Sequence, residues 1–169
     1  MKTLILYASN HGITAQCAEQ LQKRLGGTAD LIRLTKGKAP ELSAYDTVIL
    51  GGSIYAGGLQ KAMKTFAAGH TQELLTKRLG LFISCMSPEE DVPQLKANFP
   101  SELVTHASAV ARLGGGFRFS DMNFIEKGMI SAISKSEAKK KGTAPEYDGK
   151  TDIFNISESG MEKMVSAMR

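Results

Sequence analysis

The sequence predicts an α/β fold in which a doubly wound sheet of five parallel strands carries helices on both faces. Three uninterrupted apolar runs, at residues 4–8, 48–50 and 81–83, are short and are each followed by Ser or Gly. Such runs are typical of parallel strands that are buried on both faces. Helical patterns lie between the runs, and this alternation with short connections gives right-handed crossovers. Ligands of such sheets bind at the carboxyl ends of the strands, so the residues after each run are the candidates for a binding site.

The remaining elements follow from weaker patterns. The charged segment 29–34 predicts an exposed edge strand, and the looser apolar segment 107–113 predicts the fifth strand. Four helices are expected from apolar residues three or four positions apart, or from capping residues. Their markers are Thr14, Ala18, Leu21 and Leu25 before Gly26 and Gly27; Ala62, Met63 and Phe66 before Gly69; Ser87, Pro88 and Glu90; and Met161, Met164, Val165 and Met168 after Ser157 or Ser159.

Length and composition limit the class of protein. With 169 residues and 42% hydrophobic residues, the chain is expected to form a single domain with a substantial core. No apolar run approaches the ~18 residues of a membrane span, and the first run is too short for a signal peptide. Cys17 and Cys85 are far apart and the three histidines are scattered, so neither a disulfide framework nor a metal site is expected. We therefore expect a cytoplasmic protein, and its net charge of +4 is too small to indicate a nucleic-acid partner.

The strongest chemical pattern follows the first apolar run. The residues that open the first predicted helix are Ser9, Asn10, His11, Gly12, Ile13 and Thr14. A helix N-terminus presents unpaired N–H groups and a positive dipole end, which suits a phosphate. Ser9 and Thr14 supply hydroxyl donors, Gly12 allows close backbone approach, and His11 is expected as a further donor rather than a catalytic residue. With no Lys or Arg in the loop, neutral donors would hold a terminal monophosphate; the alternative is an ordinary turn capped by Ser9 or Asn10.

Together with a second loop, this pattern resembles the flavodoxin-like FMN-binding proteins. The second loop, after the third predicted strand, is Gly51-Gly52-Ser53-Ile54-Tyr55-Ala56-Gly57. The chain is closer to one branch, the flavodoxin-domain proteins that include menaquinone-dependent protoporphyrinogen dehydrogenase. That branch has such a loop, a loop opening with Ser after the fourth strand and a long insertion after the fifth, which correspond here to Ser84 and to residues 117–150. The resemblance covers essentially the whole chain and implies an FMN cofactor and the strand order 2-1-3-4-5.

The resemblance also implies that the second loop packs against the flavin ring. Its expected contact residues are Ser53, Ile54, Tyr55, Ala56 and Gly57. Tyr55 is the candidate for stacking on the ring, and the backbone carbonyl of Ala56 or Gly57 is expected near the ring nitrogen N5. Gly57 and Gly58 permit a backbone with positive φ. Taken alone, the loop is equally typical of a surface turn with a half-exposed tyrosine.

Further ring contacts are expected after the last two strands. Ser84, Cys85 and Met86 form a third loop without an aromatic residue, so one face of the ring would stay open to a substrate. Cys85 is expected to be a small buried residue rather than a redox thiol, and Met86 either a ring contact or a core residue. Gly115 and Gly116 are expected at the same edge of the sheet, where they either approach the ring or form a flexible turn.

The insertion at about residues 117–150 has three possible interpretations. Met122, Ile125, Met129 and Ile133 are spaced as on an amphipathic helix, whereas the lysine-rich segment 134–150 predicts a flexible loop. The helix could pack on the sheet edge, form a lid over a pocket for an apolar planar molecule such as a quinone or porphyrin, or contact a membrane surface or a second copy. The resemblance favours the lid.

The sequence therefore predicts an FMN-dependent oxidoreductase that passes electrons from an organic donor to a quinone-type acceptor. No protein residue is predicted to be catalytic, because the flavin would carry the redox chemistry. Two alternatives are a flavodoxin-type electron carrier that docks on other redox proteins and an FMN-binding module without activity. The net charge of +4 disfavours the carrier, since electron-carrier flavodoxins are typically acidic.

Overall fold

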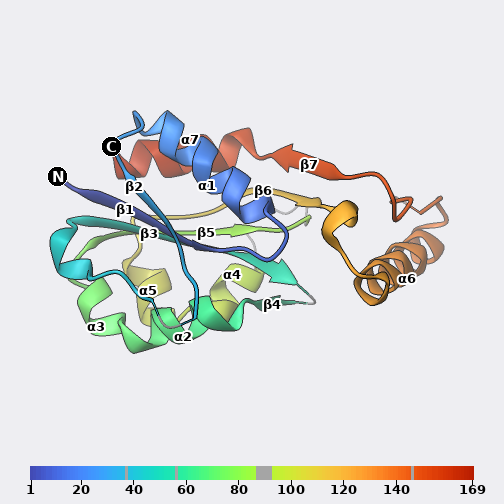
Figure 1. Ribbon diagram of the computed structural model, residues 1–169, viewed down its shortest axis with the longest axis horizontal. Coiled ribbons are helices and arrows are strands. Elements are labelled where there is room, and N and C mark those ends of the chain that lie inside the picture. Colours follow the sequence, from blue (N-terminus) through green and yellow to red (C-terminus); the bar gives the residue numbers. More distant parts are fainter. Residues whose placement is uncertain (37, 56, 87–92, 146) are drawn as a thin grey trace.

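A central sheet with helices on both of its faces forms the body of the molecule (Figure 1). The computed structural model describes residues 1–36, 38–55, 57–86, 93–145 and 147–169, apart from the side chain of Tyr55. The strands are β1 (Thr3–Ala8), β2 (Asp30–Arg33), β3 (Thr47–Tyr55), β4 (Gly58–Leu59), β5 (Arg78–Ser84), β6 (Ala109–Phe117) and β7 (Ile153–Ile156). The helices are α1 (Ile13–Arg24), α2 (Lys61–Gly69), α3 (Thr71–Leu74), α4 (Pro93–Asn98), α5 (Ser101–His106), α6 (Phe124–Lys141) and α7 (Glu158–Met168), with short 3₁₀ turns η1 (Leu42–Ala44) and η2 (Phe119–Asp121).

The sheet confirms the predicted parallel core and extends it. Five strands are parallel neighbours in the order β2-β1-β3-β5-β6. Numbered along the chain as parallel strands, this order is the predicted 2-1-3-4-5. Two antiparallel strands are additional: β4 pairs with the end of β3, and β7 extends the sheet beyond β6. Both are too short, at two and four residues, to produce a recognisable periodic pattern in the sequence.

The glycines at the end of the fifth parallel strand lie inside β6, so the expectation of a flexible turn there is wrong. Gly114, Gly115 and Gly116 pair with β7. A Cβ atom at Gly114 would lie 2.4 Å from the carbonyl oxygen of Asn155, and one at Gly116 would lie 2.0 Å from that of Ile153. The absence of side chains therefore permits β7 to approach, which is a long-range pairing that local sequence patterns do not report.

The core has two parts, one on each face of the sheet. Leu6 and Leu50 belong to a cluster that includes buried residues of α2, α4 and α5. Ile5, Ile49 and Phe82 face the opposite side and pack with buried residues of α1 and α7. This alternation follows from the period of two in a strand, and because both faces are covered the strands are apolar at almost every position.

Three predicted helices agree with the structure. α1, α2 and α7 occupy the expected segments, and the chain turns after α1 at Gly26 and Gly27, whose φ angles are 91° and 74°. The hydroxyl of Ser157 accepts a hydrogen bond from the N–H of Gly160, so Ser157 is the cap of α7. The capped helix start predicted at residues 87–90 lies outside the described residues.

Helix α6 corrects the first part of the loop predicted at residues 134–150, because it continues through the lysine-rich segment as far as Lys141. It begins with a capping box in which Asn123 accepts from the N–H of Glu126 and Glu126 accepts from that of Asn123. Ser134 and Ala138 are buried one turn apart, which gives the second half of the helix a packed side. The lysines of the last turn interact favourably with the negative end of the helix dipole, so their charge does not oppose the helix.

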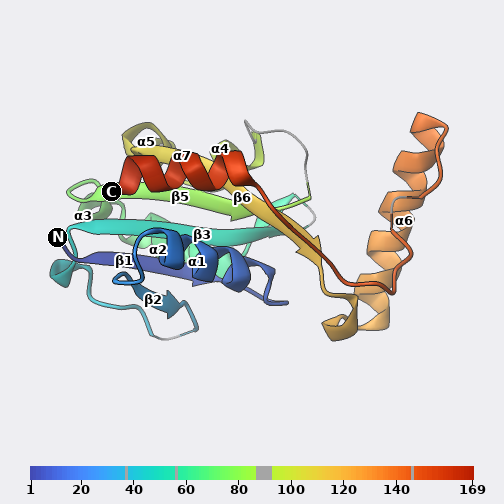
Figure 2. The same cartoon turned by 90° about the horizontal axis from the view of Figure 1, so that it is seen from above.

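α6 lies apart from both helical layers, beyond the carboxyl ends of the parallel strands (Figures 1 and 2). The chain leaves the sheet at the end of β6 and returns to it through β7, so the segment between them is anchored at two neighbouring strands. Within the described ranges, no helix is long and apolar enough to cross a membrane.

The two cysteines should differ in reactivity. Cys17 is fully buried, and burial raises the pKa of its thiol to about 12. Cys85 is partly exposed, so the prediction that it is buried is wrong, because it lines a cavity. At pH 8 the Cys17 thiolate is therefore scarce and shielded. We expect iodoacetamide to alkylate Cys85 in the native protein and Cys17 only after unfolding in guanidinium chloride, as followed by peptide mass spectrometry. Equal native rates at the two residues would contradict the buried placement.

Candidate functional site

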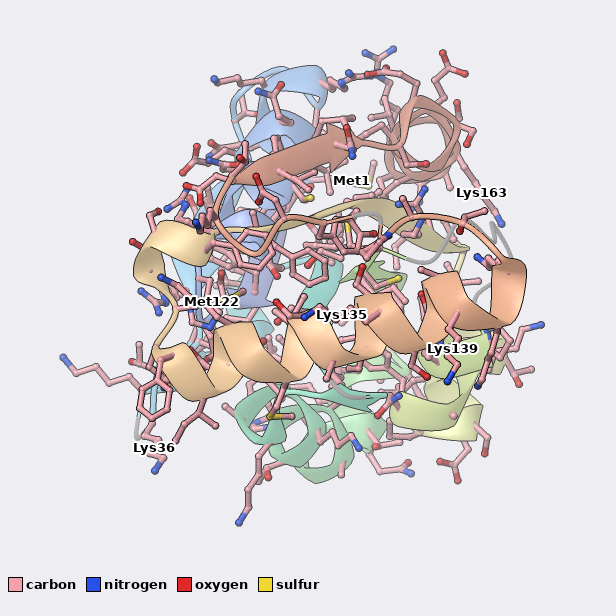
Figure 3. The ribbon with its side chains drawn as sticks, turned by 90° about the vertical axis from the view of Figure 1, so that its right-hand side faces the viewer. Met1, Lys36, Met122, Lys135, Lys139 and Lys163 are labelled. Carbon is pink, nitrogen blue, oxygen red and sulfur yellow. The ribbon has the colours of Figure 1, made fainter. Side chains whose placement is uncertain are left out.

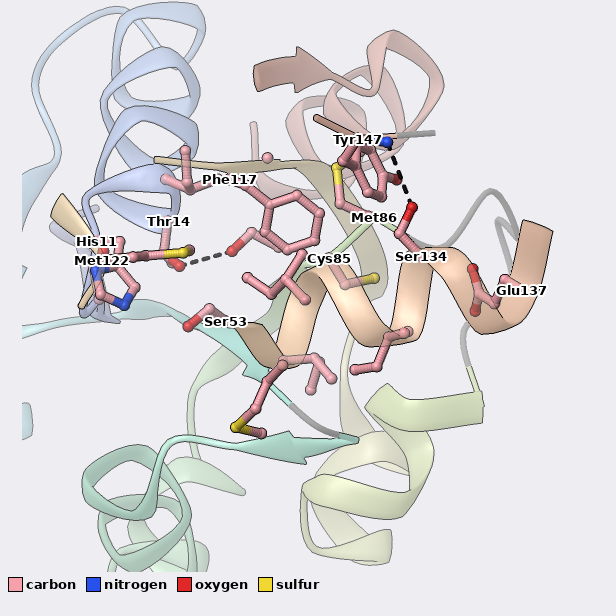
Figure 4. A pocket seen from close by; sticks show the side chains of 18 residues that line it. His11, Thr14, Ser53, Cys85, Met86, Phe117, Met122, Ser134, Glu137 and Tyr147 are labelled. Atoms are coloured by element: carbon pink, nitrogen blue, oxygen red, sulfur yellow. Dashed lines mark hydrogen bonds between the residues drawn. The ribbon is translucent and has the colours of Figure 1, made fainter. Parts of the chain in front are cut away.

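A cavity of about 180 Å³ opens between the carboxyl edge of the sheet and α6 (Figure 4). Its walls come from the segment after β1, from the end of β3, from the end of β5 and the residues that follow it, from the end of β6, and from α6 with its flanking segments. The lining residues are Ser9, His11, Ile13, Thr14, Ser53, Ile54, Ser84, Cys85, Met86, Gly116, Phe117, Met122, Met129, Ile130, Ile133, Ser134, Glu137 and Tyr147. The floor carries hydroxyls and the roof is mostly apolar, which suits a ligand with a polar end and a flat apolar body.

The segment between β1 and α1 forms a cradle at one end of this cavity. Gly12 is the N-cap of α1 and has a φ of 83°, in the left-handed region that favours glycine. Its N–H donates to Ser9 Oγ at 3.0 Å. The Ser9 hydroxyl therefore holds the turn before α1, as in the alternative of a turn capped by Ser9, while the N-cap residue itself offers no side chain to the first turn of the helix. A left-handed glycine, nearby hydroxyls and the unpaired N–H groups of a first helical turn fit a phosphate group.

A buried hydrogen bond joins this cradle to the third loop. Thr14 Oγ1 and Ser84 Oγ lie 2.7 Å apart, and both side chains are buried. The two residues come from adjacent regions of the sheet edge but are 70 positions apart in the chain. The contact therefore fixes the distance between the cradle and the end of β5.

Gln60, which the sequence analysis did not select, joins the cradle to the second loop. With its amide oriented to satisfy its neighbours, Gln60 accepts from the N–H of Asn10 at 3.0 Å and from the hydroxyl of Ser53 at 3.1 Å. Arg33 adds a second support, because its Nη2 donates to the carbonyl oxygen of Ser9 at 2.6 Å. Neither residue lies in a recognisable motif, so only the folded arrangement reveals them.

The segment predicted as the second loop is strand as far as Tyr55, because its residues pair with β5 and then with β4, so the prediction of a loop is wrong there. The end of this second loop, at Gly57, is held from the side by α4. Gly57 has a φ of 76°, as expected, whereas Gly58 begins β4. Asn98 accepts from the N–H of Leu59 at 3.0 Å and donates to the carbonyl oxygen of Gly57 at 3.2 Å. The Gly57 carbonyl is thus bonded to α4, which corrects the expectation that it faces the flavin ring; Ala56, the other candidate, lies outside the described residues.

The third loop is fixed against β6 through its backbone. The N–H of Cys85 donates to the carbonyl oxygen of Gly114 at 2.9 Å, and Arg112 Nη1 donates to the carbonyl oxygen of Cys85 at 3.2 Å. A Cβ atom at Gly115 would lie only 2.0 Å from the same Cys85 oxygen. Glycine at this position therefore allows the third loop to lie close to β6, and Met86 completes this wall of the cavity (Figure 4).

The roof comes from the insertion. Met129, Ile130 and Ile133 of α6 line the cavity, and Met129 and Ile133 remain 43% and 51% exposed. Such exposure of large apolar side chains beside an open cavity is typical of a surface that a ligand covers. Within the described residues, no group of three or more His, Cys, Asp or Glu could hold a metal ion.

An aromatic cluster closes the cavity between β6 and α6. Phe117 lies 5.5 Å from Phe119 and 4.9 Å from Tyr147, measured between ring centroids, and the ring of Tyr147 is edge-on to that of Phe117. The N–H of Tyr147 donates to Ser134 Oγ at 3.4 Å, as Figure 4 shows. This cluster fastens the segment after α6 to the end of β6.

Ten of the predicted contact residues line the cavity. They are Ser9, His11, Ile13, Thr14, Ser53, Ile54, Ser84, Cys85, Met86 and Gly116. Asn10, Gly12, Gly57 and Gly115 shape the backbone around it without lining it, while Ala56 and the side chain of Tyr55 lie outside the described residues. The structure thus brings the three predicted loops together, and the roles of these residues in binding remain predictions.

Other lining residues were missed as contacts. Phe117, Met122, Met129, Ile130 and Ile133 appear in the apolar pattern of the insertion, but that pattern alone does not say what they face. Ser134, Glu137 and Tyr147 fall in the segment predicted as a loop. Ser134 and Glu137 continue the spacing of three to four residues that begins at Met122. Extending the predicted helix beyond Ile133 on this spacing would therefore have placed both residues on α6.

The comparisons with known proteins agree with this geometry. A family model described as a flavodoxin domain matches residues 4–144. The chain belongs to the flavodoxin domain family. Within this family, protoporphyrinogen IX dehydrogenase (quinone) of Escherichia coli strain K12 is 26% identical over 155 residues, which are 86% of each chain. The family-model match includes most of the insertion, up to residue 144, as well as the parallel strands.

Solved flavodoxins share the fold. Oxidised flavodoxin 2 from Bacillus cereus superposes with a TM-score of 0.53 at 26% identity and covers 66% of this chain and 83% of its own. The flavodoxin of Streptococcus pneumoniae TIGR4 gives a TM-score of 0.52 at 19% identity and covers 80% of this chain and 99% of its own. These flavodoxin-domain structures confirm the predicted fold class.

Two glycine substitutions should have opposite effects. At Gly115, alanine would place a Cβ 2.0 Å from a backbone oxygen, which cannot move without displacing the third loop. At Gly128 in α6, no atom lies within 4 Å of the new Cβ. We expect Gly115→Ala to lower the free energy of unfolding by about 1–3 kcal/mol, and Gly128→Ala to raise it by about 0.5–1 kcal/mol. Urea denaturation measures both, and a neutral Gly115→Ala would argue against the close packing of the third loop on β6.

Proposed function

We propose that this flavodoxin-domain protein is an FMN-dependent oxidoreductase that passes electrons from an apolar organic donor to a quinone-type acceptor. The observation that carries the proposal is the cavity itself, which has a phosphate cradle at one end and an apolar roof supplied by the insertion. A cofactor with a phosphate tail and a flat ring matches both parts. The roof leaves additional apolar surface at the position where a second planar molecule would lie.

The residues at the floor of the cavity would hold the cofactor. Ser9, Thr14 and the first-turn N–H groups of α1 would bind the phosphate, in agreement with the donors that the cradle offers. Ser53 and Met86 would flank the ring from the second and third loops. FMN, when bound, supplies hydride and one-electron transfer, and the protein contributes orientation, exclusion of water and tuning of the ring.

A quinone acceptor is supported by two observations. The Escherichia coli relative is named protoporphyrinogen IX dehydrogenase (quinone) and matches 86% of this chain, and the flavodoxin-domain match extends into the insertion that forms the roof, as far as residue 144. Met129, Ile133 and Phe117 give that roof an apolar face with an aromatic edge, which suits a planar apolar molecule. Protoporphyrinogen IX is accordingly the first donor to test.

The alternative is an electron carrier that docks on other redox proteins, as the solved flavodoxins that share its fold suggest. The net charge of +4 favours acidic rather than basic docking partners. Stopped-flow mixing of the reduced protein with a menaquinone analogue separates the two functions. Fast oxidation supports the enzyme, and slow oxidation together with rapid transfer to a redox protein supports the carrier.

The proposed location is the cytoplasm, with contact to the membrane surface where quinones reside. Phe124 and Ile125, at the start of α6, are 82% and 60% exposed, and the last turn of α6 carries three lysines. Apolar and basic side chains on one exposed helix are typical of interfacial binding to anionic lipid. Sedimentation with vesicles that contain phosphatidylglycerol tests this contact, with the Phe124→Ser and Ile125→Ser double variant as the comparison.

The proposed cofactor predicts a flavin spectrum and a role for Thr14. The purified protein should bind FMN, as followed by quenching of flavin fluorescence. Thr14→Val removes a buried hydroxyl at the cradle and should weaken FMN binding about tenfold, corresponding to about 1–1.5 kcal/mol for one lost hydrogen bond. Thr105→Val on α5, which also removes a hydroxyl bonded to the chain, is the control and should leave FMN affinity unchanged. A protein that ignores FMN would refute the proposed function.

The proposed roof predicts a separation between cofactor binding and turnover. The double variant Met129→Ser and Ile133→Ser removes apolar contacts from the roof but leaves the phosphate cradle intact. We expect the KM for a menaquinone analogue to rise about tenfold, from roughly 1–2 kcal/mol of lost apolar burial, while FMN affinity changes little. Lys135→Ser on the outward side of α6 is the matched control (Figure 3). Unchanged turnover in the double variant would show that α6 does not contact the acceptor.

A further inference from the structure

The insertion places a cation at the phosphate cradle. The segment from Ser9 to Thr14 contains no lysine or arginine, so the sequence predicts that neutral donors alone hold the phosphate. In the folded chain, the guanidinium of Arg118 lies beside Gly12, the residue that starts α1. The position of a Cβ atom on Gly12 is 2.7 Å from Nη1, 3.2 Å from Cζ and 3.4 Å from Nη2 of Arg118.

The position of Arg118 follows from the end of β6. Phe117 is the last residue of that strand, and its ring is held in the aromatic cluster. Arg118 comes next and directs its side chain toward the start of α1, where it is partly buried. The glycine at position 12 leaves space for the guanidinium in its observed position, because a Cβ atom there would require the end of the Arg118 side chain to shift.

The other charged contacts of Arg118 are weak. Its Nη1 lies 3.5 Å from Asp121 Oδ2, and the Asp121 side chain is half exposed. The pKa of Asp152 is below its usual value, first because the backbone and hydroxyl of Ser120 donate to it and, to a smaller extent, because Arg118 is near. Exposed ion pairs of this kind contribute little free energy, so the guanidinium can serve a stronger anion.

A second contact links the same loop to the insertion. His11 Nε2 lies 3.3 Å from Glu126 Oε1, and Glu126 is also the residue that completes the capping box of α6. The phosphate loop is therefore contacted by Arg118, before α6, and by Glu126, in its first turn. Arg33, the other arginine at the loop, is already bonded to the backbone oxygen of Ser9 and supports the loop from behind.

We propose that Arg118 binds the phosphate of the flavin and thereby makes the site selective for FMN over riboflavin. The inference rests on the proposed function, since it assumes that a flavin phosphate lies at the start of α1. A guanidinium offers a planar pair of N–H donors that matches phosphate oxygens and binds them with charge-assisted hydrogen bonds. The same interaction fixes the base of α6, so phosphate binding at one end of the cavity orders the roof at the other.

The test compares two flavins and three variants in the full chain. Dissociation constants for FMN and for riboflavin are measured by fluorescence quenching for the wild-type protein, Arg118→Gln, Arg118→Lys and Lys135→Gln. Lys135→Gln removes the same charge from an exposed position on α6 and controls for net charge (Figure 3). Thermal unfolding of each variant controls for loss of structure.

We expect Arg118→Gln to weaken FMN binding at least tenfold and to change riboflavin binding less than threefold. The charge-assisted hydrogen bond that the variant loses forms only to a phosphate, which FMN has and riboflavin lacks. Arg118→Lys should recover part of the affinity, and Lys135→Gln should have no effect. Raising the salt concentration should weaken FMN binding in the wild-type protein more than in Arg118→Gln.

Hydrogen exchange provides a readout that is independent of affinity. FMN should slow amide exchange at the start of α6 in the wild-type protein, and riboflavin should not, because only FMN carries the group that Arg118 contacts. An equal loss of FMN and riboflavin affinity in Arg118→Gln, or no loss of FMN affinity, would overturn the proposal while leaving flavin binding intact. A protein that binds neither flavin would instead refute the proposed function on which the inference rests.

Discussion

The close backbone approach at the end of β6 is the constraint on which the rest of the site depends. Gly115 admits the Cys85 carbonyl on one side of the strand, and Gly116 admits the Ile153 carbonyl of β7 on the other. The first contact sets the third loop of the cavity, and the second anchors the return of the insertion. Side chains at these two positions would separate both neighbours from β6, so the same pair of adjacent glycines determines where the floor and the roof of the cavity lie.

The floor and the roof of the cavity are held in place by different kinds of contact. Its floor is built from parallel strand ends, and hydrogen bonds between side chains and loops, such as Thr14 to Ser84 and Gln60 to Ser53, hold the strand ends in register. Its roof is a helix that touches the body through a few side chains at its base and through the aromatic cluster near Tyr147. The floor is therefore defined by the sheet, whereas the roof depends on a small number of contacts.

The parallel strands and the three segments that line the floor of the cavity could be predicted from the sequence, because they depend on local patterns. Apolar runs such as residues 4–8 indicate a strand that is buried on both faces of the sheet. Gly12, which follows such a run, indicates the start of a helix. Prediction from the sequence failed where the cause is a distant partner. Gly115 and Gly116 are in a strand because β7 pairs with them, and the carbonyl of Gly57 accepts a hydrogen bond from Asn98 on α4. The prediction of a loop from residue 134 was wrong up to Lys141 for a different reason, since lysines are good helix formers and their charge does not indicate disorder.

The insertion leaves the sheet at β6 and returns through the neighbouring strand β7. This arrangement has a consequence for how flavodoxin-domain proteins diversify. Because the chain exits and re-enters the sheet at adjacent positions, the segment between β6 and β7 can be lengthened, shortened or exchanged without rethreading the fold. New acceptor preferences could then arise by remodelling one peripheral module while the inherited flavin cradle is kept. Residues such as Arg118, which belong to the module but reach the cradle, mark the limit of that independence.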